Sequence, residues 1–516
     1  MNKNLILVAL LTSLCVIATP GYTAPFASAD QSRVDYTKAR YQPKVSCDNM
    51  TSLTTTEHTV VSAKYVDGVC RVSGVIPEEI RFEVNLPDNW NGRTLMLGNG
   101  GLAGQPASDP QVMAMRDSVL AHNFVSVYSD NGHDSRVEPG ASFAHNNIAK
   151  LIDYGYRAVH LTQVTAEQLV KTYYRRAQNH SYFMGCSNGG RQALMAAQRF
   201  PNDFDGIVAG APANNFTGLK FSQAHRMRAI LDSDMNLNKA TNLGKHILAA
   251  CDESDGLKDR LISDPTQCNF KPDDLPICGE AVNDECYTKR DISALNTFYA
   301  AVEVAGVQVY PPFPVGSETT GPQSFGDYPG WMPWVINPRG RPILDVLGSE
   351  FFRYIVFVKD NPELVWTDVD FNEAPDNLAF TRDVLDAVDP DLAPFKQAGG
   401  KIISYFGWAD PDINPLSAIQ YHSEVKQSVA DTDDFYRLFM VPGMFHCVGG
   451  PGPSQFDAFT PLVEWVEKDL PPSSIEATHM RDGESVYTRP LCPHPEQARF
   501  DAAGDVMAAA SFSCQQ

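Results

Sequence analysis

Hydrophobic residues form two different patterns over the first part of the chain. Short apolar runs rich in β-branched and aromatic residues predict strands, and they alternate with stretches in which apolar residues recur at helical spacing. This alternation predicts an α/β fold, with a parallel-rich sheet and helices on both of its faces. We expect strands within residues 93–101, 123–132, 180–185 and 204–213, and helices within 154–174 and 190–200.

The alternation stops after the fourth of these strands and returns near residue 396. The segment 214–395 is rich in proline, aromatic residues and cysteine, and its pattern fits neither period. Two further strand-then-loop patterns follow at 399–411 and 435–447. We therefore predict a core in two parts, 30–213 and 396–516, and interpret 214–395 as a large inserted lid domain.

The first 29 residues are typical of an export signal. Lys3 precedes the apolar run 5–18, which is shorter than a typical membrane span. Ala27-Ser28-Ala29 is a good cleavage site. A cut after Ala24 is the weaker alternative, because Tyr22 would occupy a position that favours small side chains. We expect a secreted or periplasmic protein with no membrane contact once this leader is removed.

Composition limits the partners of the protein. Of the 516 residues, 43% are hydrophobic and 20% are charged, so the chain can bury a substantial core. The formal charge of −21 argues against nucleic acid and anionic membranes as partners, because an acidic surface repels polyanions.

The cysteines are consistent with export. Cys15 lies in the leader, and an even number of cysteines remains, which suggests disulfide bonds. Counting alone cannot choose among the pairings. Neighbours in the sequence could close local loops as Cys47/Cys70, Cys251/Cys268, Cys278/Cys286 and Cys492/Cys514, which leaves Cys186 and Cys447.

A candidate nucleophile lies in the sequence GCSNGG at 185–190. Gly185, Ser187 and Gly189 fit the pattern Gly-x-Ser-x-Gly, in which a serine is exposed at a sharp strand-to-helix turn. The backbone N–H of the following residue, Asn188, can then stabilise an oxyanion. An ordinary tight turn is the alternative, but the predicted strand before the motif and the predicted helix after it favour the nucleophile.

A nucleophilic serine needs a histidine base and an acid that orients it, and in α/β-hydrolases the order along the chain is Ser, Asp, His. His446 and Asp410 fit this order, each in a loop after a predicted strand. Asp412 is the alternative acid. The alternative base, His422, falls in a helical pattern, while His133 and His145 precede the serine.

The two cysteines without a local partner flank these candidates. Cys186 directly precedes Ser187, and Cys447 directly follows His446. A disulfide between them would tie the nucleophile loop to the histidine loop and hold serine and base within reach of each other. Two unrelated buried cysteines are the alternative.

With these motifs the chain resembles the tannase and feruloyl esterase family of α/β-hydrolases, which includes enzymes that cleave mono(2-hydroxyethyl) terephthalate. The family's mark is a Cys-Ser pair, an Asp and a His-Cys pair with the two cysteines bridged. The matching residues are Cys186-Ser187, Asp410 in GWADP and His446-Cys447. The sequences DYGYRAVH, DGIVAGAPA and RPLCPHP resemble the family as well.

The resemblance implies an α/β-hydrolase core and a serine carboxylic-ester hydrolase that works through an acyl-enzyme. It implies that Gly101 supplies the second oxyanion N–H, with Gly100 as the neighbouring candidate. We expect a small-molecule ester of an aromatic acid as substrate, and a feruloyl esterase first. A tannase or a terephthalate monoester hydrolase is the alternative within the family. A peptidase, a lipase or a non-catalytic binding protein on the same fold are the alternatives outside it.

An acidic loop is a candidate calcium site. Residues 251–268 carry three aspartates between two cysteines, and calcium prefers such oxygen ligands. The spacing is not that of an EF-hand, and a solvated acidic loop is the alternative. The resemblance implies a structural calcium ion in the lid and no organic cofactor. Its expected ligands are Asp252, Asp255 and Asp259, with the carbonyls of Leu257 and Leu261.

The aromatic residues of the insertion suit a flat acyl group. Trp331 and Phe352 are the candidates for substrate contact, and a small core of the lid itself is the alternative for each. Arg353 is a candidate for a substrate carboxylate, with a surface salt bridge as the alternative.

Overall fold

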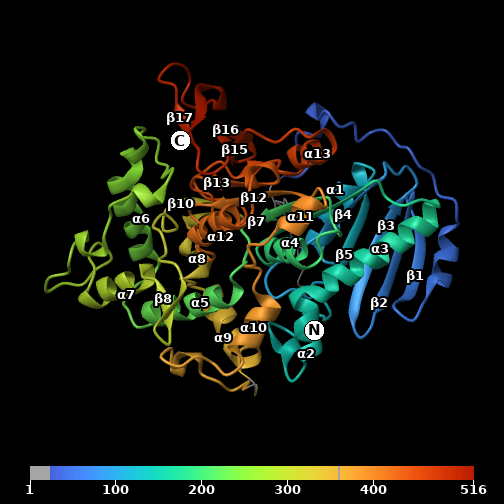
Figure 1. The fold of residues 1–516 in the computed structure, drawn as a ribbon. Helices are drawn as coiled ribbons and strands as arrows, with labels where there is room; N and C mark the ends of the chain where they lie inside the picture. Colours follow the sequence, from blue (N-terminus) through green and yellow to red (C-terminus); the bar gives the residue numbers. More distant parts are fainter. Residues whose placement is uncertain (1–23, 358, 360) are drawn as a thin grey trace, which may run out of the picture.

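Nine strands form the central sheet of the computed structural model, which describes residues 24–357, 359 and 361–516 (Figure 1). The strand order is β1-β2-β3-β5-β4-β6-β7-β12-β13. The strands from β5 to β13 run parallel, and β1 to β3 add an antiparallel end. The strands are β1 Thr59–Val66, β2 Val69–Ile76, β3 Ile80–Pro87, β4 Arg93–Leu97, β5 Val125–Ser129, β6 His180–Cys186, β7 Gly206–Gly210, β12 Lys401–Gly407 and β13 Tyr436–Val441.

Helices cover both faces of this sheet. Successive side chains of a strand point to opposite faces, and here they enter two different cores. Leu95 and Tyr182 belong to one buried cluster, and their neighbours Met96 and Phe183 belong to the other. The first cluster includes residues of α1 Pro110–Ala121, α13 Phe459–Lys468 and the insertion, and the second includes residues of α3 Ala158–Tyr174, α4 Asn188–Arg199, α11 Ala393–Gln397 and α12 Pro415–Ser428. This is the two-sided arrangement of an α/β-hydrolase fold.

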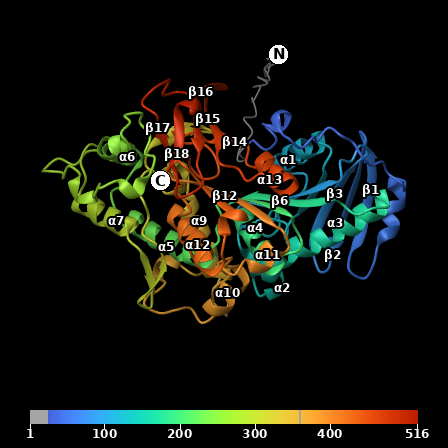
Figure 2. The same cartoon turned by 45° about the horizontal axis from the view of Figure 1, so that its top comes forward.

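The insertion leaves the sheet after β7 and rejoins it at β12. These two strands are parallel neighbours, so residues 211–400 depart from one sheet position and return to the next. The predicted lid, 214–395, falls inside this excursion, which projects to one side of the sheet in Figures 1 and 2. It contains α5 Phe216–Leu231, α6 Leu237–Cys251, α7 Lys289–Tyr299, β8 Val302–Val304, β9 Val307–Tyr310, β10 Thr320–Gln323, β11 Gly326–Pro329, α8 Trp331–Trp334, α9 Ile343–Tyr354 and α10 Leu378–Leu385.

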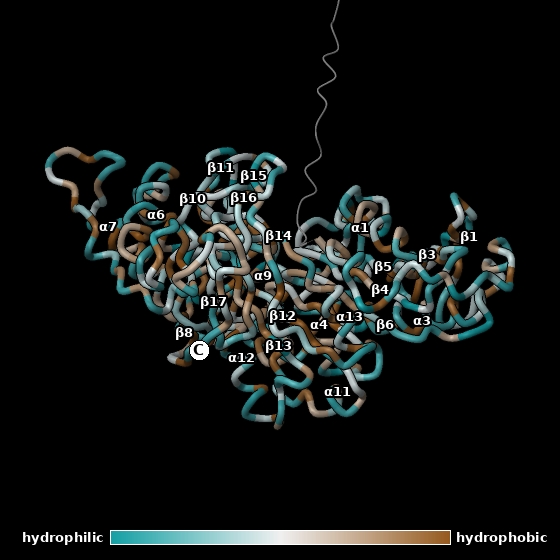
Figure 3. Tube along the Cα trace, turned by 90° about the horizontal axis from the view of Figure 1, so that it is seen from above, coloured by the Kyte–Doolittle hydropathy of each residue, from teal (hydrophilic) through white to brown (hydrophobic). Residues whose placement is uncertain are grey.

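Short antiparallel sheets are formed by the part of the chain after β13. They comprise β14 Gln455–Phe456, β15 Ile475–Arg481 and β16 Glu484–Leu491 in one sheet, and β17 Gln497–Phe500 with β18 Phe512–Gln515 in another. In Figure 3 the outer loops are mostly hydrophilic, and hydrophobic segments gather in the interior around β12 and α4. In the part of the chain that the structure describes, no helix is long and apolar enough to cross a membrane.

Five disulfide bonds join the described cysteines, which agrees with the local pairings and with the long-range pair predicted from the sequence. They are Cys47–Cys70, Cys186–Cys447, Cys251–Cys268, Cys278–Cys286 and Cys492–Cys514.

The end of the predicted leader packs on the folded core. Leader residues 1–23 lie outside the described residues. Phe26 is buried, stacks on His122 with ring centroids 4.2 Å apart and meets Phe459 edge to face. Ser28 donates two hydrogen bonds to Asp457, from its backbone N–H and its hydroxyl. Cleavage after Ala29 would remove both residues, whereas cleavage after Ala24 would keep them.

Candidate active site

Ser187 occupies the turn between β6 and α4. Its backbone is in a left-handed conformation that a non-glycine residue seldom adopts, with φ 63° and ψ −121°. The Ser187 N–H donates to Gly210 O on the neighbouring strand at 2.9 Å. A Cβ atom at Gly185 would lie 2.7 Å from Gly189 Cα, so the first glycine of the motif lets strand and helix approach. The turn has the geometry of a nucleophile elbow.

Asp410 lies in the loop after β12, and His446 lies in the loop after the neighbouring parallel strand, β13. His446 Nδ1 is 2.7 Å from Asp410 Oδ2. The other carboxylate oxygen accepts hydrogen bonds from the backbone N–H groups of Asp412, at 2.8 Å, and Ile413, at 3.0 Å. The carboxylate therefore orients the imidazole through Nδ1, and Nε2 is the ring nitrogen left for the serine.

Two opposing effects act on the pKa of His446. Burial of the ring disfavours its charged form, but the charge of Asp410 and the hydrogen bond to it outweigh burial and raise the pKa of His446. A base whose pKa is raised towards neutrality accepts a proton readily near physiological pH.

The disulfide Cys186–Cys447 connects the two loops. Its Cα atoms are 6.1 Å apart although 261 residues separate them in the sequence. Ser187 and His446, the neighbours of these cysteines, border one cavity of about 330 Å³. The structure thus brings the predicted serine, histidine and aspartate together.

The predicted oxyanion donors lie on either side of the serine. Asn188 is the first residue of α4, where the backbone N–H has no partner within the helix. Gly101 follows β4 in a loop that lines the cavity, with φ 56° in the region that favours glycine. Gly100, the alternative donor, lines the cavity too.

The cavity is lined by both apolar and polar side chains. Trp334 meets His446 edge to face, with ring centroids 4.9 Å apart. Among the residues described as lining the cavity, His446 is the one side chain that can carry a positive charge, while Asp109 and Asp412 bring negative charge. The apolar side chains of the wall are Leu97, Val112, Met115, Trp334, Ile343 and Leu347.

Two predicted substrate contacts lie elsewhere. Trp331 is fully buried and donates from Nε1 to Ser317 Oγ at 3.0 Å, and Phe352 is fully buried against Phe221. Both belong to the core of the insertion, which was the alternative interpretation, and neither borders the cavity. Trp334 takes the place expected of Trp331, and the aromatic composition of the segment could not distinguish these two residues.

The side chains of the remaining sequence candidates do not form part of the triad. Asp412 accepts a hydrogen bond from Gln223 instead of orienting the histidine. His422 is buried against Tyr436, and burial lowers its pKa to about 4. The ring of His133 stacks on Phe143. His145 packs near Tyr354, and Arg353 donates to Leu364 O and lies near Glu350.

The acidic loop places some of its predicted ligands around a second cavity, which has a volume of about 220 Å³. Asp255, Leu257, Asp259 and Leu261 all line it. Asp252 instead accepts backbone hydrogen bonds within the loop, and Asp259 forms an ion pair of 2.9 Å with Arg489. Burial, together with the nearby charge of Asp255, raises the pKa of Asp259 although Arg489 opposes the shift.

In the described residues, no three acidic, histidine or cysteine side chains are gathered as for a bound metal ion. Calcium thus remains a prediction, in which Asp255 and Asp259 are the better-placed acids and Asp252 is the less well-placed one.

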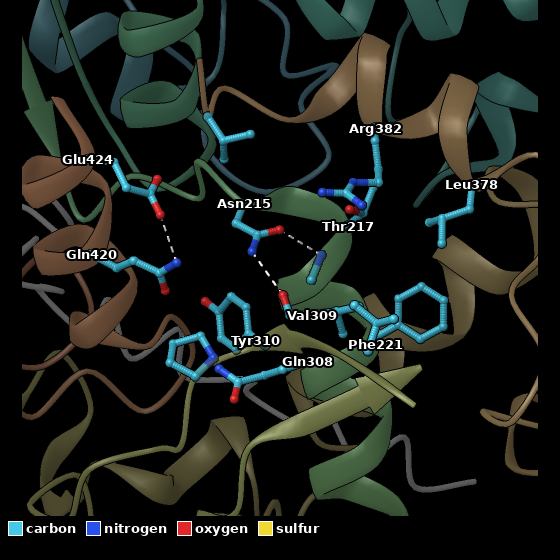
Figure 4. Close-up of a pocket in the computed structure, with 14 residues that line it drawn as sticks. Asn215, Thr217, Phe221, Gln308, Val309, Tyr310, Leu378, Arg382, Gln420 and Glu424 are labelled. Atoms are coloured by element: carbon cyan, nitrogen blue, oxygen red, sulfur yellow. Dashed lines mark hydrogen bonds between the residues drawn. The ribbon is translucent and has the colours of Figure 1, made fainter. Parts of the chain in front are cut away.

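A third cavity, of about 270 Å³, lies between α5, β9 and α10 of the insertion and α12 of the core (Figure 4). Its polar side chains bind one another or the backbone: Asn215 donates to Val309 O, and Gln420 donates to Glu424. None of the triad residues borders it. The candidate active site is therefore the cavity beside Ser187.

Comparison with known proteins shows the family of the chain. The family described as tannase and feruloyl esterase matches residues 64–515. The chain is 32% identical to a mono(2-hydroxyethyl) terephthalate hydrolase of Piscinibacter sakaiensis, over 86% of this chain and 84% of that protein. It is 31% identical to a probable feruloyl esterase B-2 of Aspergillus terreus, over 86% of each chain.

Solved structures of a feruloyl esterase and a tannin acyl hydrolase have the same fold as this chain. Feruloyl esterase B from Aspergillus oryzae superposes with a TM-score of 0.78 at 27% identity, covering 91% of this chain and 99% of that one. A tannin acyl hydrolase from Aspergillus niger shares the fold at 20% identity, with a TM-score of 0.68 over 97% of this chain and 96% of that one. The chain belongs to the tannase and feruloyl esterase family and is a carboxylic ester hydrolase.

Proposed function

We propose that this esterase hydrolyses esters of uncharged phenolic acids, with feruloyl esters preferred over terephthalate monoesters, and that Ser187, His446 and Asp410 carry the reaction. The observation that carries the proposal is the Asp410–His446 hydrogen bond beside the Ser187 elbow, in a cavity with an aromatic edge and no lysine or arginine among its described lining residues. Galloyl esters are the second candidate, since gallic acid is also an uncharged phenol when esterified.

The reaction proceeds in two halves. Ser187 Oγ attacks the ester carbonyl carbon while His446 Nε2 takes the hydroxyl proton, and the N–H groups of Gly101 and Asn188 receive the oxyanion. The tetrahedral intermediate collapses, the alcohol leaves with the proton from His446, and the acyl group stays on Ser187. A water molecule activated by His446 then attacks this ester, which releases the acid and restores the serine. Asp410 keeps the imidazole oriented and stabilises its cationic form.

The charges around the cavity support an uncharged acyl group. A terephthalate monoester carries a free carboxylate opposite its ester group, and burial of an unpaired carboxylate is costly. No lysine or arginine among the described lining residues would pair with it, and Asp109 and Asp412 would repel it. Gln105 supports a phenolic substrate, because its Oε1 is buried without a hydrogen-bond partner among the described residues and can accept from a hydroxyl group.

The test is a comparison of kcat/KM for methyl ferulate, methyl gallate and mono(2-hydroxyethyl) terephthalate with the purified protein. We expect methyl ferulate to be the best substrate. Asp109→Asn should raise relative turnover of the terephthalate monoester about threefold to tenfold by removing one repulsive charge. Asparagine is as good a helix N-cap as aspartate, so α1 should stay intact. Equal turnover of both substrates by the unaltered protein would contradict the proposal.

We further propose that the mature protein is exported and that its acidic loop binds calcium. Five disulfide bonds support export, because such bonds persist in oxidising compartments. The shared cavity of Asp255, Asp259 and the backbone of Leu257 and Leu261 supports calcium, which favours oxygen ligands. The ion would order the lid and take no part in the chemistry.

A further inference from the structure

Two side chains outside the triad connect the segments that carry the two expected oxyanion donors, the N–H groups of Gly101 and Asn188. They are Tyr154 and Arg191, and both are almost completely buried. Tyr154 lies in a π-helical turn, Asp153–Arg157, between α2 Ile148–Ile152 and α3. Such turns interrupt regular helices and are frequent at functional sites.

Tyr154 anchors the glycine loop. Its hydroxyl donates to Gly101 O at 3.0 Å. A Cβ atom added at Gly100 or Gly101 would have no neighbouring atom within 4 Å, so side-chain packing does not restrain these two residues from that side. Glycine has more backbone freedom than other residues. A hydrogen bond to this carbonyl therefore restricts the loop where the N–H group must be aimed.

Arg191 holds Asn188, the residue that carries the other expected oxyanion donor. Its Nε donates to Asn188 Oδ1 at 2.8 Å, one helical turn earlier in α4. Its Nη2 donates to Tyr154 O at 2.9 Å, and its Nη1 donates to Gly155 O and Leu385 O. The guanidinium also lies over the Tyr154 ring, 4.9 Å from the centroid.

The connections form a closed circuit. Asn188 Nδ2 donates to Asn99 O at 3.3 Å, and Asn99 belongs to the same loop as Gly101. The circuit runs from Gly101 through Tyr154, Arg191 and Asn188 to Asn99. A displacement of either donor would therefore strain contacts of the other.

The burial of Arg191 supports a specific role. Its side chain is fully buried, and its hydrogen bonds go to carbonyl oxygens. Burial lowers the pKa of Arg191. A buried charge costs stability unless its hydrogen bonds are well satisfied, and apolar replacements often serve packing as well. Packing alone thus does not explain a guanidinium at this place.

We propose that Tyr154 and Arg191 are positioning residues that hold the Gly101 loop and Asn188 in one geometry for the oxyanion. The proposal rests on the proposed function only in assigning the oxyanion to these two N–H groups. It does not depend on which acyl group the enzyme prefers, so an activated ester such as p-nitrophenyl acetate can test it separately.

The test compares Tyr154→Phe with Tyr174→Phe. Tyr174 is a matched control, because it is equally buried on the following helix and donates to a backbone carbonyl, Pro87 O, at 2.7 Å. Tyr154→Phe should lower kcat for p-nitrophenyl acetate and methyl ferulate about 10-fold to 100-fold. KM and the acid limb of the pH profile should stay unchanged. A trifluoromethyl ketone analogue, which forms a tetrahedral oxyanion on the serine, should bind more weakly by a similar factor.

Asn188→Ala provides a second variant that keeps the backbone N–H but loses the contact with Arg191. It should lower kcat in the same way. Full activity of either folded variant, a loss confined to KM, or an equal loss in Tyr174→Phe would overturn the proposal. Activity of wild-type protein on p-nitrophenyl acetate without activity on aromatic esters would instead contradict the proposed substrate class. Activity of Ser187→Ala would contradict the proposed nucleophile.

Discussion

The buried Asp410 and the partly buried His446 form a pair in which one carboxylate oxygen accepts from the imidazole and the other accepts from two backbone N–H groups. The pair explains how a histidine in this position can have a raised pKa: the neighbouring charge overcomes the effect of burial. The backbone N–H groups of its own loop thus hold the carboxylate in place.

The pair predicts the acid limb of the pH profile. His446 must be neutral to act as base, so activity falls as the pH drops through its pKa. Because this pKa is raised above the ordinary value of 6.5, we expect the acid limb of kcat/KM to have its midpoint above pH 6.5. Asp410→Asn should move the limb below pH 6.5 and lower kcat by roughly 10⁴-fold, because the charge and the tautomer are both lost.

Asp412→Asn is the matched control. It removes a charge from the same loop, but Asp412 binds Gln223 and not the histidine. We expect a much smaller change in both kcat and the pH midpoint. An acid limb at or below pH 6.5 in the unaltered enzyme would contradict the inferred pairing.

The disulfide beside the nucleophile should matter more for activity than for folding. Replacing Cys186 and Cys447 together by serine should lower kcat about 100-fold or more, because a displacement of about 1 Å between serine and base is enough for such a loss. The free energy of unfolding should fall by about 2–5 kcal/mol, with the other four bridges intact. The same replacement of Cys47 and Cys70 is the control. It should cost stability and leave kcat nearly unchanged, as measured by melting and kinetics. Equal loss of kcat in both double variants would refute this role.

Calcium should stabilise the protein through the acidic loop. Free calcium at about 100 times its dissociation constant would add about 2.7 kcal/mol to the free energy of unfolding. Thermal melts with chelator and with added calcium measure this, and Asp255→Asn should abolish the difference. Glu253→Gln is the control, because Glu253 lies in the same loop but is exposed and paired with Lys258. Identical melting under both conditions, with no metal in the purified protein, would exclude the site.

The mature chain should retain Phe26. Its ring fills a cluster with His122 and Phe459, and loss of a buried phenylalanine side chain costs about 3–5 kcal/mol. We expect intact mass measurement of the exported protein to show cleavage before Phe26. A chain that starts at Asp30 should melt at a lower temperature than one that starts at Pro25. A measured N-terminus at Asp30 would show that this packing is dispensable.

The sequence predicts the parallel half of the sheet well for a physical reason. Strands such as β6 and β12 are covered on both faces, so nearly all of their residues are buried, most of them are apolar, and short hydrophobic runs reveal them. The antiparallel strand β1 is largely exposed and has no comparable run. The triad follows the same rule, because each of its residues lies in the turn or loop that follows a strand of that parallel half.

Some local features depend on packing and backbone angles that the sequence pattern does not reveal. Trp331 and Trp334 lie in one short helical segment, but Met332 between them has extended backbone angles, φ −93° and ψ 129°. The two indoles therefore do not share a helix face, and one is in the core while the other meets His446. The π-helical turn that carries Tyr154 was likewise hidden, because apolar residues continue at helical spacing on either side of it.

The route of the chain between β7 and β12 has a consequence for biosynthesis. When β7 leaves the ribosome, the edge on which β12 will pair stays open until about 190 further residues have been made. Asp410 and His446 are made only after that, and Cys447 is made 261 residues after Cys186. The nascent chain thus carries its nucleophile early but has no base to activate it. Hydrolytic activity appears only when the chain from β12 onwards has docked, so a chain truncated within the lid is inert.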